Sequence, residues 1–219
     1  GADEIAVTCS SGIAEYPRHG VRHGLTGCAM TAMRAAKQLG GGAHAEYDAR
    51  MGSDQREHNE LARDLRVAVE QGQLELFYQP KIDARSMQIT AAEALLRWHH
   101  PKRGVVSPAL FIPIAEQHRL ICGIGNWVVE EAARQAAVWR DMGLRMRVAV
   151  NVSGYQMRQD DFVDRLAKAL RTHRLQPSRF TCEITETVAM EDTAVTLASF
   201  ERLGALGVHV SIDDFGTGH

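Results

Sequence analysis

The chain has 219 residues, a hydrophobic share of 45% and a formal net charge of −2. This length and composition are those of a globular protein with one large domain or two small ones. The near-neutral charge argues against a DNA or RNA polymer as partner, because nucleic-acid-binding domains are usually strongly basic. No stretch reaches the about 20 apolar residues of a membrane helix, so we expect no membrane segment in this chain.

The cysteines predict neither a zinc ribbon nor a disulfide framework. Cys9, Cys28, Cys122 and Cys182 are scattered, with no CxxC pair and no regular spacing. Free thiols are the rule in a reducing compartment, so we expect a cytoplasmic protein. The full-length protein could still be anchored to a membrane through a sensor region outside this sequence.

The first part of the chain, residues 1–51, predicts a strand over 7–17, a helix over about 25–39 and a break at three consecutive glycines, 40–42. It is too short to form a stable domain alone. The next part, residues 52–73, contains a charged helix over about 54–71. An apolar residue recurs there every four positions, which predicts a connecting helix with one packed face.

From residue 74 onward, strand patterns and helix patterns alternate. We expect strands over 74–80, 91–98, 147–153, 180–186 and 208–216, and helices over about 108–118, 124–142, 161–173 and 193–206. Alternating β and α units predict an α/β fold with a mostly parallel sheet, either open or closed into a barrel.

Four of these strands carry an acid or its amide near the end: Glu93, Asn151, Glu183 and Asp213. Side chains alternate between the two faces along a strand, so each of these residues lies opposite the apolar face of its strand. Carboxylate and amide oxygens that converge in space form a site for a hard cation such as Mg²⁺ or Mn²⁺ rather than for zinc. Taken singly, an acid at a strand end is more often solvated or capping than catalytic, and the prediction depends on the four together.

Six motifs in order resemble the EAL domain of cyclic-di-GMP phosphodiesterases. They are FYQP at 77–80, EAL within EALLRW at 93–98, FIPIAEQ at 111–117, NVS at 151–153, EITE at 183–186 and DDFGTG at 213–218. The resemblance implies a TIM-like (β/α) barrel, of which residues 74–219 would be the N-terminal part. A full (β/α)₈ barrel takes about 250 residues, so this sequence alone would lack part of the active site.

Residues 1–51 resemble the end of a GGDEF, or diguanylate cyclase, domain. The stretch 7–17 matches a late strand of that family, 29–40 matches its last helix, and GADEI at 1–5 looks like a degenerate GGDEF turn. The resemblance implies a small α+β remnant in front of the connecting helix. Ala2 stands where glycine would let the backbone approach a phosphate, so a cyclase activity is the least favoured interpretation.

The EAL resemblance also assigns roles to single residues. It implies a two-ion site of Mg²⁺ or Mn²⁺ held by Glu93, Asn151, Glu183, Asp213 and Asp214, with Glu93, Asp213 and Asp214 catalytic. It implies substrate contacts from Gln79, Leu95 and Arg97, and it makes Glu186 a residue that positions a loop. Arg97 shares a strand face with Glu93, where a guanidinium can bind a phosphate through two hydrogen bonds.

Two functions of different classes follow from the resemblance. The first is a phosphodiesterase that hydrolyses cyclic di-GMP to linear pGpG in bacterial signalling, as a homodimer. The second is a catalytically inactive receptor for cyclic di-GMP. Every ligand position present in this sequence holds a competent residue, which favours the enzyme.

Overall fold

The computed structural model describes residues 7–38, 40–190 and 194–213. The contacts within the chain divide the protein into two compact units, Gly1–Arg63 and Asp64–His219. In the described part of the chain, no helix combines the length and apolar character that a bilayer crossing requires.

The first unit contains a short parallel pair of strands, β1 (Ser11–Ile13) and β2 (His44–Glu46), with helix α1 (Leu25–Gln38) packed on β1. Gly12 makes this packing possible. A Cβ atom at residue 12 would lie 1.9 Å from the carbonyl oxygen of Ala29 in α1, so only glycine fits this close approach.

Helix α2 (Ala49–Ala68) carries the chain across the boundary between the units. The sequence predicted a start near residue 54, but the helix begins five residues earlier. The reason is Asp48, whose Oδ1 accepts a hydrogen bond of 2.9 Å from the backbone N–H of Arg50. A side-chain acceptor at a helix start satisfies one of the free N–H groups of the first turn.

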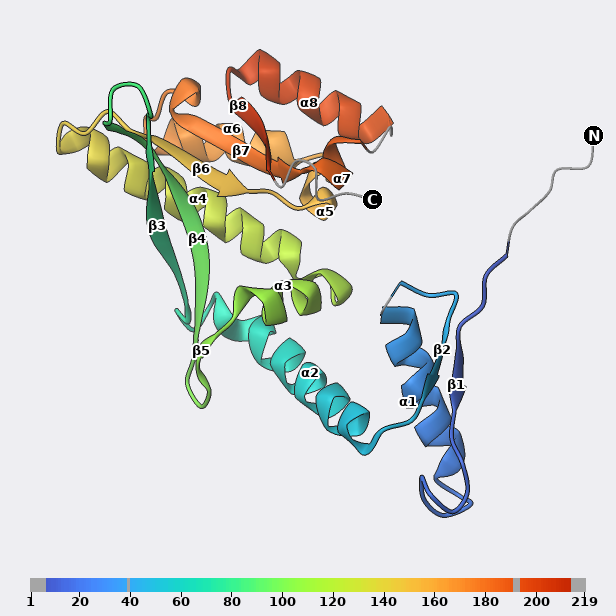
Figure 1. Cartoon of the computed structure of the whole chain (residues 1–219). Helices are drawn as coiled ribbons and strands as arrows, with labels where there is room; N and C mark the ends of the chain where they lie inside the picture. Colours follow the sequence, from blue (N-terminus) through green and yellow to red (C-terminus); the bar gives the residue numbers. More distant parts are fainter. Residues whose placement is uncertain (1–6, 39, 191–193, 214–219) are drawn as a thin grey trace, which may run out of the picture. The chain divides into compact units, whose positions relative to one another are not determined.

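The second unit is built on a mixed sheet (Figure 1) in the strand order β3-β4-β6-β7-β8. Its strands are β3 (Leu74–Ile82), β4 (Ile89–His100), β6 (Arg147–Asn151), β7 (Phe180–Thr185) and β8 (His209–Asp213). β3 runs antiparallel to β4, and the neighbours from β4 to β8 run parallel. A short strand that the sequence did not predict, β5 (Gly104–Val106), pairs antiparallel with the end of β4.

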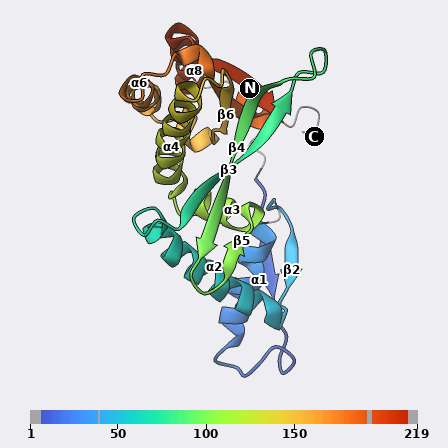
Figure 2. The same ribbon diagram turned by 90° about the vertical axis from the view of Figure 1, so that its left-hand side faces the viewer.

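Helices connect the parallel strands, as the alternating pattern predicted. The long ones are α3 (Pro108–Gln117), α4 (Ile121–Asp141), α6 (Phe162–Thr172) and α8 (Ala194–Leu206). Short ones, which sequence reasoning missed, are α5 (Gly154–Met157), a 3₁₀ turn (Pro177–Arg179) and α7 (Glu186–Ala189). α4 packs against β6 and α6, and Figure 2 shows α4, α6 and α8 gathered on one side of the sheet.

The core lies between this sheet and these helices. Val148 and Val150 of β6, Phe180 and Cys182 of β7, and Trp98 of β4 are fully buried. The apolar faces of β6 and β7 are therefore covered, as the sequence predicted. For β8 the same prediction was wrong, because Val210 and Ile212 are 39% and 48% exposed on this edge strand of the described sheet.

We expect Phe180→Ala to destabilise the second unit by about 3–5 kcal/mol, because the truncation removes a fully buried ring and leaves a cavity. The measurement is urea unfolding followed by tryptophan fluorescence. Phe77→Ala is the matched control, since Phe77 is 49% exposed and its truncation should have less than half that effect. Equal losses for the two variants would contradict this placement of the core.

Candidate active site

The parallel strands place their polar ends at one edge of the sheet. In the strand register, Glu93 lies beside Ala149 of β6, Asn151 lies beside Glu183 of β7, and Asp213 lies beside Thr185. The carboxyl ends of parallel strands meet at the same edge, and this edge is where open and closed α/β sheets bind ligands.

Glu93, Glu183 and Asp213 form an acid cluster at this edge. One carboxylate oxygen from each lies within 4.8 Å of the other two. Asn151 joins the cluster, because its Nδ2 donates a hydrogen bond of 3.0 Å to Oε1 of Glu93. The structure thus brings together the four described residues that the sequence proposed as metal ligands.

Glu183 is the buried member of the cluster, with only 5% of its surface exposed. Its Oε2 is buried and has no hydrogen-bond partner among the described residues. Burial raises the pKa of Glu183, and the nearby Lys81 opposes that rise only in part. An unsatisfied carboxylate oxygen in such a place is unfavourable, and a hard cation bound there would satisfy it. The donor set therefore fits a divalent ion such as Mg²⁺ or Mn²⁺.

Lys81 is the site residue that sequence reasoning missed. Its ammonium donates a short hydrogen bond to Oε1 of Glu183 and lies 3.4 Å from Oε2 of Glu93. Burial by itself would lower the pKa of Lys81, but the two carboxylates raise it overall. A signal was present in the sequence, because Lys81 lies two residues after Gln79 in β3 and therefore on the same strand face.

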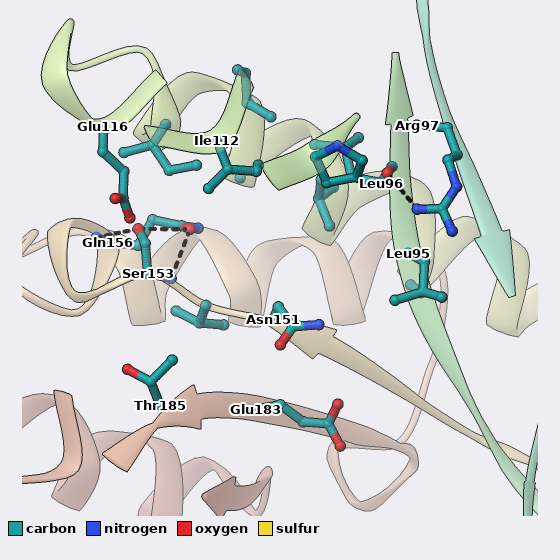
Figure 3. A pocket seen from close by; sticks show the side chains of 17 residues that line it. Leu95, Leu96, Arg97, Ile112, Glu116, Asn151, Ser153, Gln156, Glu183 and Thr185 are labelled. Atoms are coloured by element: carbon teal, nitrogen blue, oxygen red, sulfur yellow. Dashed lines mark hydrogen bonds between the residues drawn. The ribbon is translucent and has the colours of Figure 1, made fainter. Parts of the chain in front are cut away.

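A cavity of about 330 Å³ opens beside the acid cluster, at the ends of β4, β6 and β7 (Figure 3). Leu95, Arg97, Asn151 and Glu183 line it together with apolar side chains. Most of these apolar side chains come from α3 and α4, and they include Pro108, Ile112, Ile121, Ile124 and Val128.

The guanidinium of Arg97 rests on an aromatic ring of the neighbouring strand. Its Cζ lies 5.5 Å from the ring centre of Phe77, and its Nη1 donates a hydrogen bond of 2.9 Å to the carbonyl oxygen of Leu96. Gln79 is exposed and pairs with Glu93 across the β3–β4 ladder. Of the three predicted substrate residues, Leu95 and Arg97 line the cavity, and Gln79 lies beside the acid cluster.

Of the two further predicted site residues, the structure describes only Glu186. Glu186 is the first residue of α7, directly after β7. Asp214 lies outside the described residues.

A family model for the EAL domain matches residues 62–219. The chain belongs to the EAL-domain family. It is 43% identical over 218 residues to the bifunctional diguanylate cyclase/cyclic di-GMP phosphodiesterase MucR of Pseudomonas aeruginosa, covering 99% of this chain and 32% of MucR. It is 37% identical over 225 residues to the cyclic di-GMP phosphodiesterase PdeR of Escherichia coli, covering 100% of this chain and 33% of PdeR. The chain thus spans about a third of the length of these curated relatives.

Solved structures of EAL proteins share this fold. The PaMucR phosphodiesterase in complex with c-di-GMP superposes with a TM-score of 0.70 at 46% identity, covering 73% of this chain and 65% of that one. The EAL enzyme Bd1971, with cAMP and cyclic di-GMP bound, gives a TM-score of 0.69 at 33% identity, covering 75% of this chain and 46% of that one. The mixed α/β sheet of the second unit is therefore part of the TIM-like EAL fold.

We expect Glu183→Gln in this EAL domain to weaken binding of Mn²⁺ by at least about tenfold, or about 1.4 kcal/mol, because it removes one of three carboxylates from the acid cluster. The measurement is calorimetric titration. Glu116→Gln is the matched control, since Glu116 lines the same cavity but is not in the acid cluster. An unchanged affinity in Glu183→Gln would contradict the assignment of a cation site to these residues.

Proposed function

We propose that residues 74–219 are the N-terminal part of an EAL phosphodiesterase domain that hydrolyses cyclic di-GMP to linear pGpG. The observation that carries the proposal is the convergence of three carboxylates and an amide beside a cavity. The relatives support the same substrate, since MucR and PdeR are named cyclic di-GMP phosphodiesterases and the PaMucR structure holds c-di-GMP.

In this proposal, two divalent cations would be held by Glu93, Asn151, Glu183 and Asp213. Asp214, which the EAL resemblance assigns, would be a further ligand. Bound Mg²⁺ or Mn²⁺ ions would supply Lewis acidity and a water of lowered pKa for an in-line attack on phosphorus. The carboxylates of Glu93, Glu183 and Asp213 come from three different strands, and Glu183 is the buried member of the set.

The remaining predicted residues would bind and orient the substrate. Arg97 would bind a phosphate through its guanidinium, which the ring of Phe77 holds in place. Leu95 would contact the substrate from the cavity wall, and Gln79 would do so from β3. Glu186, at the start of α7, would position the loop that follows β8.

For the rest of the chain, we propose that residues 1–51 are the remnant of a degenerate GGDEF domain and that residues 52–73 connect it to the EAL domain. The match to bifunctional MucR supports this, because it extends over 99% of the chain. We further propose that the protein is a cytoplasmic homodimer. Sedimentation of the full-length protein would test the oligomeric state.

Turnover is the decisive test. In the full-length protein, Glu93→Ala should abolish formation of pGpG with Mg²⁺ or Mn²⁺, because it removes a carboxylate that the cation cluster needs. Product formation is followed by chromatography, and Glu201→Ala on the exposed face of α8 is the control. Tight binding of cyclic di-GMP by the unaltered protein without any product would identify it as a receptor instead.

Arg97→Ala should weaken binding of cyclic di-GMP by about 1.5–3 kcal/mol, the range for a hydrogen bond to a charged group. Calorimetry in Ca²⁺, which suppresses turnover, measures the affinity. Arg85→Ala removes the same charge from the exposed β3–β4 turn and serves as the control. If both variants bind as tightly as the wild type, Arg97 does not contact the ligand.

A further inference from the structure

Lys81 occupies an unusual place for a lysine. It comes from β3, the antiparallel edge strand, and its side chain is 41% exposed, yet its ammonium lies against two members of the acid cluster, Glu93 and Glu183. The Glu183 carboxylate is only 6% exposed. A half-buried side chain thus reaches from the edge of the sheet to the most buried carboxylate of the site.

The charges explain why the ammonium lies there. Three carboxylates with oxygens within 4.8 Å of one another repel each other when all are ionised. An ammonium between two of them offsets part of that repulsion. A divalent cation bound to the same oxygens would offset it more fully, but it would also repel the ammonium at short range.

We propose that Lys81 is a positioning residue of the acid cluster. It holds Glu93 and Glu183 together in the absence of a divalent cation, and the cation displaces it when the site is loaded. This inference relies on the proposed function only for the existence of the cation site, and it does not require turnover.

The contacts of Lys81 and the binding of the cation are thermodynamically linked, and this linkage gives the direction in which stability and cation affinity should change. Contacts present only in the metal-free state stabilise that state and oppose cation binding by the same free energy. Removing the ammonium therefore destabilises the metal-free protein and tightens cation binding. An ordinary strand ion pair gives a different result. It would persist after loading, so the Lys81 ammonium would stay paired with the carboxylates and would react equally slowly with an acetylating reagent with and without metal.

The first experiment uses Lys81→Met in the full-length protein, which removes the charge and keeps most of the side-chain length. We expect the dissociation constant for Mn²⁺, measured by calorimetry, to fall by about three- to tenfold, where tenfold corresponds to about 1.4 kcal/mol. In the presence of a chelator, which keeps the site free of metal, Lys81→Met should unfold at a lower temperature than the wild type. The relevant unfolding transition is the one that shifts when Mn²⁺ is added.

Two further variants separate this effect from a general change of charge. Lys102→Met removes the same charge from the exposed turn between β4 and β5 and should leave both measurements at their wild-type values. Lys81→Arg keeps a positive charge at residue 81 and should shift the Mn²⁺ affinity less than Lys81→Met does.

The second experiment uses the wild-type protein, and so it holds even if a variant fails to fold. The rate of acetylation of the Lys81 amine, followed by mass spectrometry, should rise when Mg²⁺ is added, because the cation releases the ammonium from the two carboxylates. The rate at Lys102 should stay the same.

The outcomes distinguish this inference from the proposed function. A protein that binds no divalent cation overturns both. A protein that binds Mn²⁺ with an affinity that Lys81→Met leaves unchanged or weakens, or in which Lys81 acetylation does not respond to Mg²⁺, overturns the role of Lys81 alone. Tighter binding in Lys81→Met together with metal-dependent acetylation supports it.

Discussion

The parallel register of β4, β6, β7 and β8 is the constraint on which the site depends. It sets Asn151 beside Glu183 and brings carboxylates from β4, β7 and β8 to within 4.8 Å of one another. Such an arrangement is unfavourable in a folded protein unless something of opposite charge occupies it. The hydrophobic contacts beneath it, at fully buried residues such as Val150 and Cys182, hold the strands in that register.

Both cationic groups beside the site come from the antiparallel hairpin of β3 and β4, Lys81 from β3 and Arg97 from β4. The hairpin also supplies one carboxylate, Glu93, whereas Glu183 and Asp213 come from the parallel strands β7 and β8. Among the described residues, the hairpin can therefore balance charge at the acid cluster. It can do so because its open face carries long side chains that are only partly buried.

The wall of the cavity depends on a close contact between α4 and α5. A Cβ atom at Gly125 would lie 2.1 Å from Nε2 of Gln156, so glycine lets α4 approach the buried Gln156 side chain. Gln156 also forms a capping box with Ser153. Ser153 is the N-cap residue of α5 and lies two residues after Asn151. The same local sequence thus ends β6, begins the next helix and forms one side of the cavity.

The alternation of strands and helices was predictable from the change between strand and helix periods of the apolar residues. The two-residue period of a strand was enough to predict the covered faces of β6 and β7 and the shared strand face of Glu93, Leu95 and Arg97. The sequence also identified Asn151, Glu183 and Asp213 as one group. Contacts between residues far apart in the chain could not be predicted in this way. Lys81 and Glu183 are 102 residues apart, and Arg97 rests on Phe77 through the pairing of β3 with β4. Such pairs depend on the direction and register of neighbouring strands, which no local pattern specifies.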